Sequence, residues 1–323
     1  MTATSATRRA PLLLGIVLAI AVLAVGVVLL RGAGSSLDGL FGNDAPCTAE
    51  VDGHTVELEA DQAEQAALIS ALSVRRELPA RAASIALATA YQESKIRNLD
   101  YGDRDSLGIF QQRPSQGWGE PEQIMDPHYA TNQFYAALEQ VDGYGDLPID
   151  VAAQEVQRSA DGSAYAQHEP DARALASALT GYSEAAFSCE VDAPADSGQQ
   201  PGPSGLTDNA STVRSQVRQA FGPLPDGGYA PDGVRSGHME GSAHYDGQAV
   251  DFFFRPVTPG NQRMGWALAQ FLVANAERLD VATVIFDDRI WTASRSSEGW
   301  RDYEVDSEDP VARHLDHVHV DVA

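Results

Sequence analysis

Residues that commonly bind metal ions occur at two places near the carboxyl end of this 323-residue sequence. His244 and Asp251 are separated by six residues, and Asp316-His317-Val-His319 follows close to the terminus. Two histidines and one carboxylate are good ligands for zinc, and a catalytic zinc site leaves a fourth position open for water. These segments therefore predict a metal site. The alternative is a set of ordinary histidines at the edge of a sheet.

Two strands are expected to position these residues. Gly247 permits a turn, and residues 249–254 (AVDFFF) have the apolar and aromatic composition of a buried strand. In the terminal segment, alternation places His317, His319 and Asp321 on one face and three valines on the other. We expect the valines to face a core and the histidines to face a cleft.

A resemblance to a known group of enzymes rests on two motifs, SAHYDGQAVDF and the terminal DHVHVDV. They resemble the zinc peptidases of the D-alanyl-D-alanine carboxypeptidase, lysostaphin and hedgehog group. The resemblance implies that His244, Asp251 and His319 hold one zinc ion. It also implies that His317, or Asp316 in an alternative alignment, assists the attacking water. In a regular strand Asp316 would point away from the face of His317, unless the strand begins only after it.

A second candidate for chemistry lies at the end of a predicted helix. Residues 61–74 predict one amphipathic helix, and another follows Pro79 and ends at Gln92-Glu93-Ser94. A carboxylate at a helix C-terminus faces the negative end of the helix dipole, and partial burial would raise its pKa further. Glu93 therefore suits a general acid that works near neutral pH. The alternative is a solvated surface glutamate.

The segment around Glu93 is similar to the lytic transglycosylases and goose-type lysozymes. The matching residues are Glu93-Ser94 and a later Gly-Ile-Phe-Gln that ends at Gln111. This resemblance implies an α-helical, lysozyme-like fold in which Glu93 is the catalytic acid and Ser94 and Gln111 belong to the substrate site. Trp118 is a candidate for stacking on a sugar face, although it could equally be a core residue.

The number of catalytic carboxylates in this part stays open. Glycosidases that hydrolyse usually place two carboxylates around the bond. Enzymes of the resembled family are thought to manage with one glutamate, while the substrate forms an internal anhydro ring. Asp103 and Asp105 follow Glu93 by 10 and 12 residues, and either could supply a second acid.

Residues 10–30 form an uninterrupted apolar run, long enough for a helix to cross the hydrocarbon core of a bilayer. Arg8 and Arg9 precede this run, which favours a cytoplasmic amino end and an extracellular remainder. A cleaved signal peptide is the alternative, but the run ends in Leu-Leu-Arg-Gly and not in a small-residue cleavage site. We therefore expect an uncleaved membrane anchor.

Charge and cysteine content narrow the possible partners. The net charge of −24 argues against nucleic acid, because phosphates require a basic face. The chain has two cysteines, Cys47 and Cys189, and in an exported protein they predict one disulfide.

The expected organisation is a multidomain chain with a transmembrane helix, an α-helical lysozyme-like domain and a small α+β domain with an antiparallel sheet. The expected boundaries are a cytoplasmic tip (1–9), an anchor (10–30), a tether (31–46), the lysozyme-like domain (47–190), a linker (191–210) and the zinc peptidase-like domain (211–323). Arg235 in the last domain is a candidate for binding a substrate carboxylate, or an ordinary surface arginine.

Together the two resemblances imply a membrane-anchored peptidoglycan hydrolase that cuts glycan with one domain and stem peptide with the other. One alternative is a glycan-cleaving enzyme whose last domain is a non-catalytic, metal-bearing wall-binding module. A second is a catalytically inert cell-wall scaffold, and a third is an enzyme for another surface polysaccharide.

Overall fold

A computed structural model of the chain describes residues 47–158 and 162–323. The described residues form one compact unit by their internal contacts. The predicted cytoplasmic tip, anchor and tether (residues 1–46) lie outside the described residues. Among the residues that are described, no helix combines the length and the apolar character needed to cross a membrane.

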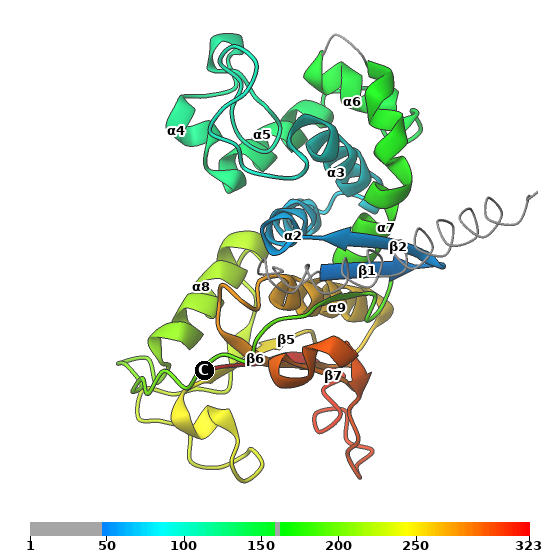
Figure 1. The fold of residues 1–323 in the computed structure, drawn as a ribbon. Coiled ribbons are helices and arrows are strands. Elements are labelled where there is room, and N and C mark those ends of the chain that lie inside the picture. The colour runs from blue at the N-terminus through cyan, green and yellow to red at the C-terminus, as the bar shows by residue number, and fades with distance from the viewer. Residues whose placement is uncertain (1–46, 159–161) are drawn as a thin grey trace, which may run out of the picture. The chain divides into compact units, whose positions relative to one another are not determined.

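Helices dominate the described residues between 47 and 190 (Figure 1). They are α2 (Ala60–Arg75), α3 (Ala80–Ser94), α4 (Pro121–Ile124), α5 (Pro127–Leu138), α6 (Ile149–Gln157) and α7 (Glu169–Leu179), with the 3-10 turns η2 (Pro114–Gln116) and η3 (Gly162–His168). The helices predicted over residues 61–74 and after Pro79 are confirmed as α2 and α3. Helix α3 is central, because it contacts α2, α5, α6 and α7.

The bounds of α3 fix the position of its last glutamate. Pro79 is the N-cap residue, and Lys95 ends the helix in the left-handed conformation with a φ of 59°. Between them, alanines occupy many of the buried positions, and alanine is the strongest helix former. The helix therefore stops directly after Glu93 and Ser94, and Glu93 stands in its last turn.

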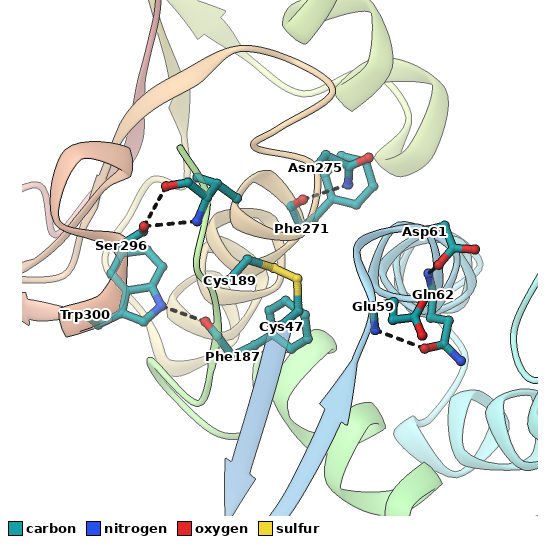
Figure 2. Close-up of a disulfide and its surroundings, with 11 residues drawn as sticks. Cys47, Glu59, Asp61, Gln62, Phe187, Cys189, Phe271, Asn275, Ser296 and Trp300 are labelled. Carbon is teal, nitrogen blue, oxygen red and sulfur yellow. Dashed lines mark hydrogen bonds between the residues drawn. A yellow bond between two sulfur atoms is a disulfide. The ribbon is translucent and has the colours of Figure 1, made fainter. Parts of the chain in front are cut away.

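A three-stranded antiparallel sheet joins the two ends of this helical part. Its strand order is β2 (His54–Leu58), β1 (Cys47–Val51), β3 (Phe187–Cys189). Cys47 and Cys189 lie opposite each other in the β1–β3 register, and their sulfur atoms form a disulfide (Figure 2). The predicted disulfide is thus confirmed.

The remaining part of the chain builds a six-stranded sheet in which every pair of neighbours is antiparallel. The strand order is β4 (Asp226–Gly227), β5 (Ala249–Phe253), β9 (His317–Val322), β6 (Val281–Phe286), β7 (Arg289–Thr292), β8 (Arg301–Asp302). Its helices and turns are α8 (Asp208–Phe221), η4 (Ala243–Asp246), α9 (Pro259–Ala274) and η5 (Ala293–Glu298). The expected antiparallel sheet is confirmed, β5 and β9 are the two predicted strands, and the three valines of β9 are buried.

Helix α9 connects the sheet with the helical part. It contacts β6 on one side and α2, α7 and β3 on the other. The side chain of Gln270 donates a hydrogen bond to the carbonyl oxygen of Ala178 at 2.7 Å. Outside the helix, the indole of Trp300 donates to the carbonyl oxygen of Phe187 at 2.9 Å (Figure 2). A helix covered on both sides is apolar nearly all round, and every residue from Gly265 to Ala274 is buried.

Between β3 and α8, residues 190–207 form neither helix nor strand. This stretch corresponds to most of the predicted linker, whose last three residues belong to α8. It is fixed to the sheet part by Ser296, whose hydroxyl accepts from the amide of Val191 and donates to its carbonyl oxygen. The elements on either side of the stretch thus pack together.

Candidate metal centre and the Glu93 site

Asp251 on β5 and His319 on β9 are direct partners in the antiparallel register, so their side chains share one face of the sheet. Asp251 Oδ1 lies 3.0 Å from His319 Nδ1 and 3.2 Å from His244 Nε2. His244 Nε2 lies 3.1 Å from His319 Nδ1, and all three residues are buried. The structure therefore brings together the three residues that the resemblance assigned to zinc.

The orientation of His244 depends on Gly228. His244 Nδ1 lies 2.8 Å from the carbonyl oxygen of Gly228, so Nδ1 carries a proton and donates it to this bond. The lone pair of Nε2 then points toward Asp251 and His319. Gly228 has a φ of +81°, and a Cβ atom there would lie 2.3 Å from Cε1 of His244. Glycine is thus required for the imidazole to occupy this place.

Carboxylates surround His319. Its Nε2 lies 2.6 Å from Asp321 Oδ1, which leaves Nδ1 facing Asp251 and His244. Burial disfavours a charge on His319, but Asp321 and Asp251 outweigh that effect and raise the pKa of His319 to about 10. Burial also acts against the charge of Asp251, yet hydrogen bonds from His244 and His319 hold the pKa of Asp251 well below its usual range. A positive charge between these side chains is therefore stabilised.

The donor set suits a metal ion. His238, His244 and Asp251 each offer one ligand atom, and these atoms lie within 4.8 Å of one another, which makes the group a possible metal site. The separations of 3.0–3.2 Å among His244, Asp251 and His319 are close to the edge of a tetrahedron, about 3.3 Å, expected for ligands bonded at about 2.0–2.1 Å. His238 was missed by the sequence reasoning, although it lies only six residues before His244.

The acidic residue and the histidine before the last ligand form a pair. Strand β9 begins at His317, so Asp316 precedes the strand. The side chain of Asp316 therefore need not point to the face opposite that of His317. Asp316 Oδ1 lies 2.8 Å from His317 Nδ1, while Asp316 Oδ2 accepts from Nε of Arg255. His317 Nε2 consequently faces the candidate metal site, at 3.8 Å from Asp251 Oδ1. Burial alone would raise the pKa of Asp316, but His317 and Arg255 outweigh burial and hold this pKa below its usual range.

His314 is a further histidine that the sequence reasoning missed. Its ring centroid lies 4.6 Å from that of His317 and 5.6 Å from that of His319. Burial, together with these two imidazoles, lowers the pKa of His314 to about 3, so the ring is neutral. The signal in the sequence was its position three residues before His317.

Arg235 is exposed on the loop between β4 and η4, and its contact with a substrate carboxylate stays a prediction.

Glu93 is half-buried at the end of α3. The hydroxyl of Tyr165 in η3 donates a hydrogen bond to Glu93 Oε1 at 2.6 Å. Burial raises the pKa of Glu93, and hydrogen bonds from Tyr165 and Gln157 act in the opposite direction without cancelling this effect. The direction of the predicted pKa shift is confirmed, and burial is its main cause.

The side chains of Ser94 and Gln111 form hydrogen bonds with the backbone of the protein. Ser94 is 5% exposed, and its hydroxyl donates to the carbonyl oxygen of Ile109 at 2.6 Å. The side-chain amide of Gln111 donates to the carbonyl oxygen of Gly108 at 3.2 Å. Ser94 therefore ties the Gly-Ile-Phe-Gln segment to α3, and the binding of substrate by Ser94 and Gln111 stays a prediction.

A cavity of about 940 Å³ opens beside α5 and α6. Its lining includes Trp118, Gln157 and several other polar side chains, among them Gln116, Gln140, Glu155 and Arg158. Gln157 links the cavity to the candidate acid, because it is hydrogen-bonded to Glu93 and donates to the carbonyl oxygen of Phe110 at 2.7 Å. Trp118 is half-buried, so it both packs against the core and faces the cavity.

The two later aspartates differ in their surroundings. Asp105 accepts hydrogen bonds from the backbone amide of Ser115 at 2.8 Å and from Arg113 Nε at 2.6 Å. Contacts with Ser115 and then Arg113 hold the pKa of Asp105 well below its usual range. A carboxylate kept ionised in this way is a poor proton donor near neutral pH, although it could still act as a base. Asp103 is exposed.

Comparison with known proteins bears on the sheet part alone. No curated protein matches this chain. One segment, residues 202–315, runs from just before α8 to the residue before Asp316, so it includes His244 and Asp251 but not His317 or His319. This segment matches the family model described as VldE, C-terminal domain.

Proposed function

We propose that this chain is a membrane-anchored peptidoglycan hydrolase with two active centres outside the membrane. One centre, around Glu93, cleaves glycan, and the other is a zinc-dependent peptidase that cuts stem peptides. The observation that carries the proposal is the convergence of His244, Asp251 and His319 beside the Asp316–His317 pair. That combination supplies metal ligands and an oriented base on one face of a sheet.

The residues of the metal centre fit one zinc ion. His244 would bind through Nε2 and His319 through Nδ1, because the carbonyl oxygen of Gly228 and the carboxylate of Asp321 lie next to their other nitrogens. When bound, zinc supplies a Lewis acid and an acidified water molecule. His319 would lose the proton from Nδ1 on metal binding, and one buried carboxylate with two imidazoles would leave such an ion with a net positive charge, which suits an electrophilic role.

The Asp316–His317 pair supports proton transfer at this centre. Asp316 Oδ1 accepts from His317 Nδ1, which leaves the lone pair of Nε2 available on the side of Asp251. His317 can then take a proton from the attacking water and return it to the leaving amine of the peptide. Asp316 acts through His317 by fixing its tautomer and orientation, and Arg255 holds Asp316 in turn.

Glu93 supports glycan cleavage as a general acid. Its raised pKa favours the protonated form that donates to a glycosidic oxygen. Tyr165 and Gln157 fix the carboxyl group, and the 940 Å³ cavity next to Gln157 offers room and polar groups for sugar units. The low pKa of Asp105 makes it a poor proton donor, so Glu93 is the better candidate for the acid, and an ionised Asp105 could still serve as the base of a hydrolytic mechanism.

One observation favours a second candidate function for the sheet part. His238 offers a further ligand atom at the metal centre. A site permanently filled by four protein ligands is structural and not catalytic. The sheet part would then be a metal-bearing module that binds the cell wall and targets the glycan-cleaving centre.

Digestion of purified peptidoglycan by the full chain tests the proposal. Products are identified by mass spectrometry for the wild type, Glu93→Gln, His244→Ala and the double variant. We expect Glu93→Gln to remove new glycan ends and His244→Ala to remove new peptide ends, each without affecting the other class. If the wild type makes no new peptide ends while binding zinc, the wall-binding module is correct and the peptidase is not.

The proposed location has a separate test. Protease added to intact cells should digest residues 47–323 and leave a short membrane-embedded fragment that contains residues 10–30. Complete protection of the chain would place these parts on the cytoplasmic side and contradict the proposed substrate.

A further inference from the structure

His238 lies directly over the candidate metal centre, although it belongs to a loop and not to the sheet. The loop connects β4 with η4. Its histidine ring stacks on the ring of His244, with centroids 3.9 Å apart and an interplanar angle of 29°. The ligand atoms of His238, His244 and Asp251 lie within 4.8 Å of one another. A modest movement of His238 would therefore bring its nitrogen to bonding distance of an ion held by the other residues.

Tyr245 clamps His238 in this position. The Tyr245 hydroxyl accepts a hydrogen bond from the backbone amide of His238 at 3.2 Å and donates one to its carbonyl oxygen at 2.6 Å. Tyr245 follows His244 directly in η4. A residue anchored beside one ligand thus holds the backbone of the loop histidine above that ligand.

The loop around His238 is more open than the elements that carry the other three ligand residues. Gly237 and Gly241 flank His238 with φ values of +97° and +77°, and a Cβ atom on either would meet nothing within 4 Å. Met239, next to His238, is 69% exposed. His244, Asp251 and His319 are instead 2%, 6% and 8% exposed on η4, β5 and β9. Three ligands are therefore fixed by packed elements, whereas His238 is held by the Tyr245 hydroxyl at its backbone and by stacking of its ring on His244.

From this contrast we propose that His238 is an exchangeable fourth ligand, which closes the metal centre at rest and gives up its position to water when a peptide substrate enters. The inference rests on the proposed zinc centre formed by His244, Asp251 and His319. It decides between the two functions considered for the sheet part, because an exchangeable imidazole gives a latent enzyme and a permanent one gives a structural site. The exchange is a substitution of one lone-pair donor for another and requires no other reactant.

X-ray absorption spectroscopy of the zinc-loaded full chain counts the imidazoles bound to the metal. We expect three in the wild type and two in His238→Ala, with zinc affinity in a chelator competition lower by at least about tenfold. Met239→Ala is the matched control in the same loop, and it should keep three imidazoles and the wild-type affinity. Tyr245→Phe removes both hydrogen bonds to His238 but no ligand, so it should lower the imidazole count toward two.

Exchange itself is tested with azide on the cobalt-substituted protein. The visible absorption of cobalt should report azide binding at a lower concentration in His238→Ala and Tyr245→Phe than in the wild type or Met239→Ala. A wild type that holds two imidazoles, unchanged in His238→Ala, overturns this inference and leaves the zinc centre intact. Three imidazoles that persist at saturating azide overturn the exchange. Absence of zinc binding by the wild type overturns the proposed centre itself.

Discussion

Asp316 and His317 are neighbours in the chain, and Asp316 Oδ1 lies 2.8 Å from His317 Nδ1. Neighbours within a strand point to opposite faces, so this contact requires the strand to begin between them. Strand β9 does begin at His317. We therefore propose two different roles for the two residues that the sequence left as competing candidates for one role, a base and the group that orients it.

The first prediction separates these roles. His319→Ala should lose both zinc and peptidase activity, because His319 supplies a ligand atom. His317→Ala should keep stoichiometric zinc and lose about two to four orders of magnitude in peptide cleavage, as is typical for loss of a general base. Elemental analysis and stem-peptide cleavage are measured on the same samples. Loss of zinc in His317→Ala would show that His317 is a ligand.

Gly228→Ala tests whether Gly228 makes room for the imidazole of His244. The added Cβ would lie 2.3 Å from Cε1 of His244, so we expect the imidazole to move and zinc affinity to fall. Gly233→Ala is the control, since Gly233 has a similar φ of +77° but nothing within 4 Å of its Cβ position. Both variants should lose about 1–2 kcal/mol of stability from the left-handed backbone, whereas only the first should lose zinc affinity in a chelator competition. Equal affinities would contradict the role of Gly228.

Glu93→Gln should lower the rate of glycan cleavage by about two to four orders of magnitude. Stability should not fall, because the pKa of Glu93 is raised in the folded state and the ionised, half-buried carboxylate destabilises the protein at neutral pH. Cleavage rates and thermal unfolding at pH 7 check the two statements. A variant with near-normal cleavage would exclude Glu93 as the acid. Anhydro-sugar ends from the wild type would identify transglycosylation, and reducing ends would identify hydrolysis.

The pH dependence of glycan cleavage should respond to Tyr165. The hydrogen bond from Tyr165 lowers the pKa of Glu93, although burial dominates. Tyr165→Phe should therefore raise this pKa, keep Glu93 protonated to higher pH and move the alkaline limb of the pH–rate profile upward. The midpoint of that limb is the measurement, with initial rates recorded across the pH range. An upward movement of the acidic limb instead would show that Glu93 must be ionised for catalysis, and a downward movement of the alkaline limb would contradict the effect of Tyr165 on the pKa of Glu93.

The disulfide should contribute strongly to stability. Cys47 and Cys189 are 142 positions apart, and in the chain-entropy model closing a loop of this length contributes about 5 kcal/mol. Urea unfolding of the double variant Cys47→Ala/Cys189→Ala measures the loss. Addition of a reductant to the wild type should produce the same change and leave the double variant unaffected, because the chain has no other cysteine. Equal stability of both proteins would contradict the entropic contribution.

The sequence by itself determined the local features of this protein. Alternation in the terminal segment predicted β9 and its buried valines, and an apolar run predicted β5. The helix before Glu93 also followed from short-range patterns. Such features depend on neighbours within a few residues, because backbone propensity and side-chain periodicity act over that distance.

Only the tertiary structure decided which side chains meet. His238 and His314 joined the candidate metal centre through loops whose conformation no periodic pattern encodes. Ser94 turned inward because a carbonyl group 15 positions later, that of Ile109, lies within reach of its hydroxyl. Asp251 faces His319 because of the register between β5 and β9, which are joined by a long connection. Register and loop path are set by packing between distant segments, so they are properties of the folded chain as a whole.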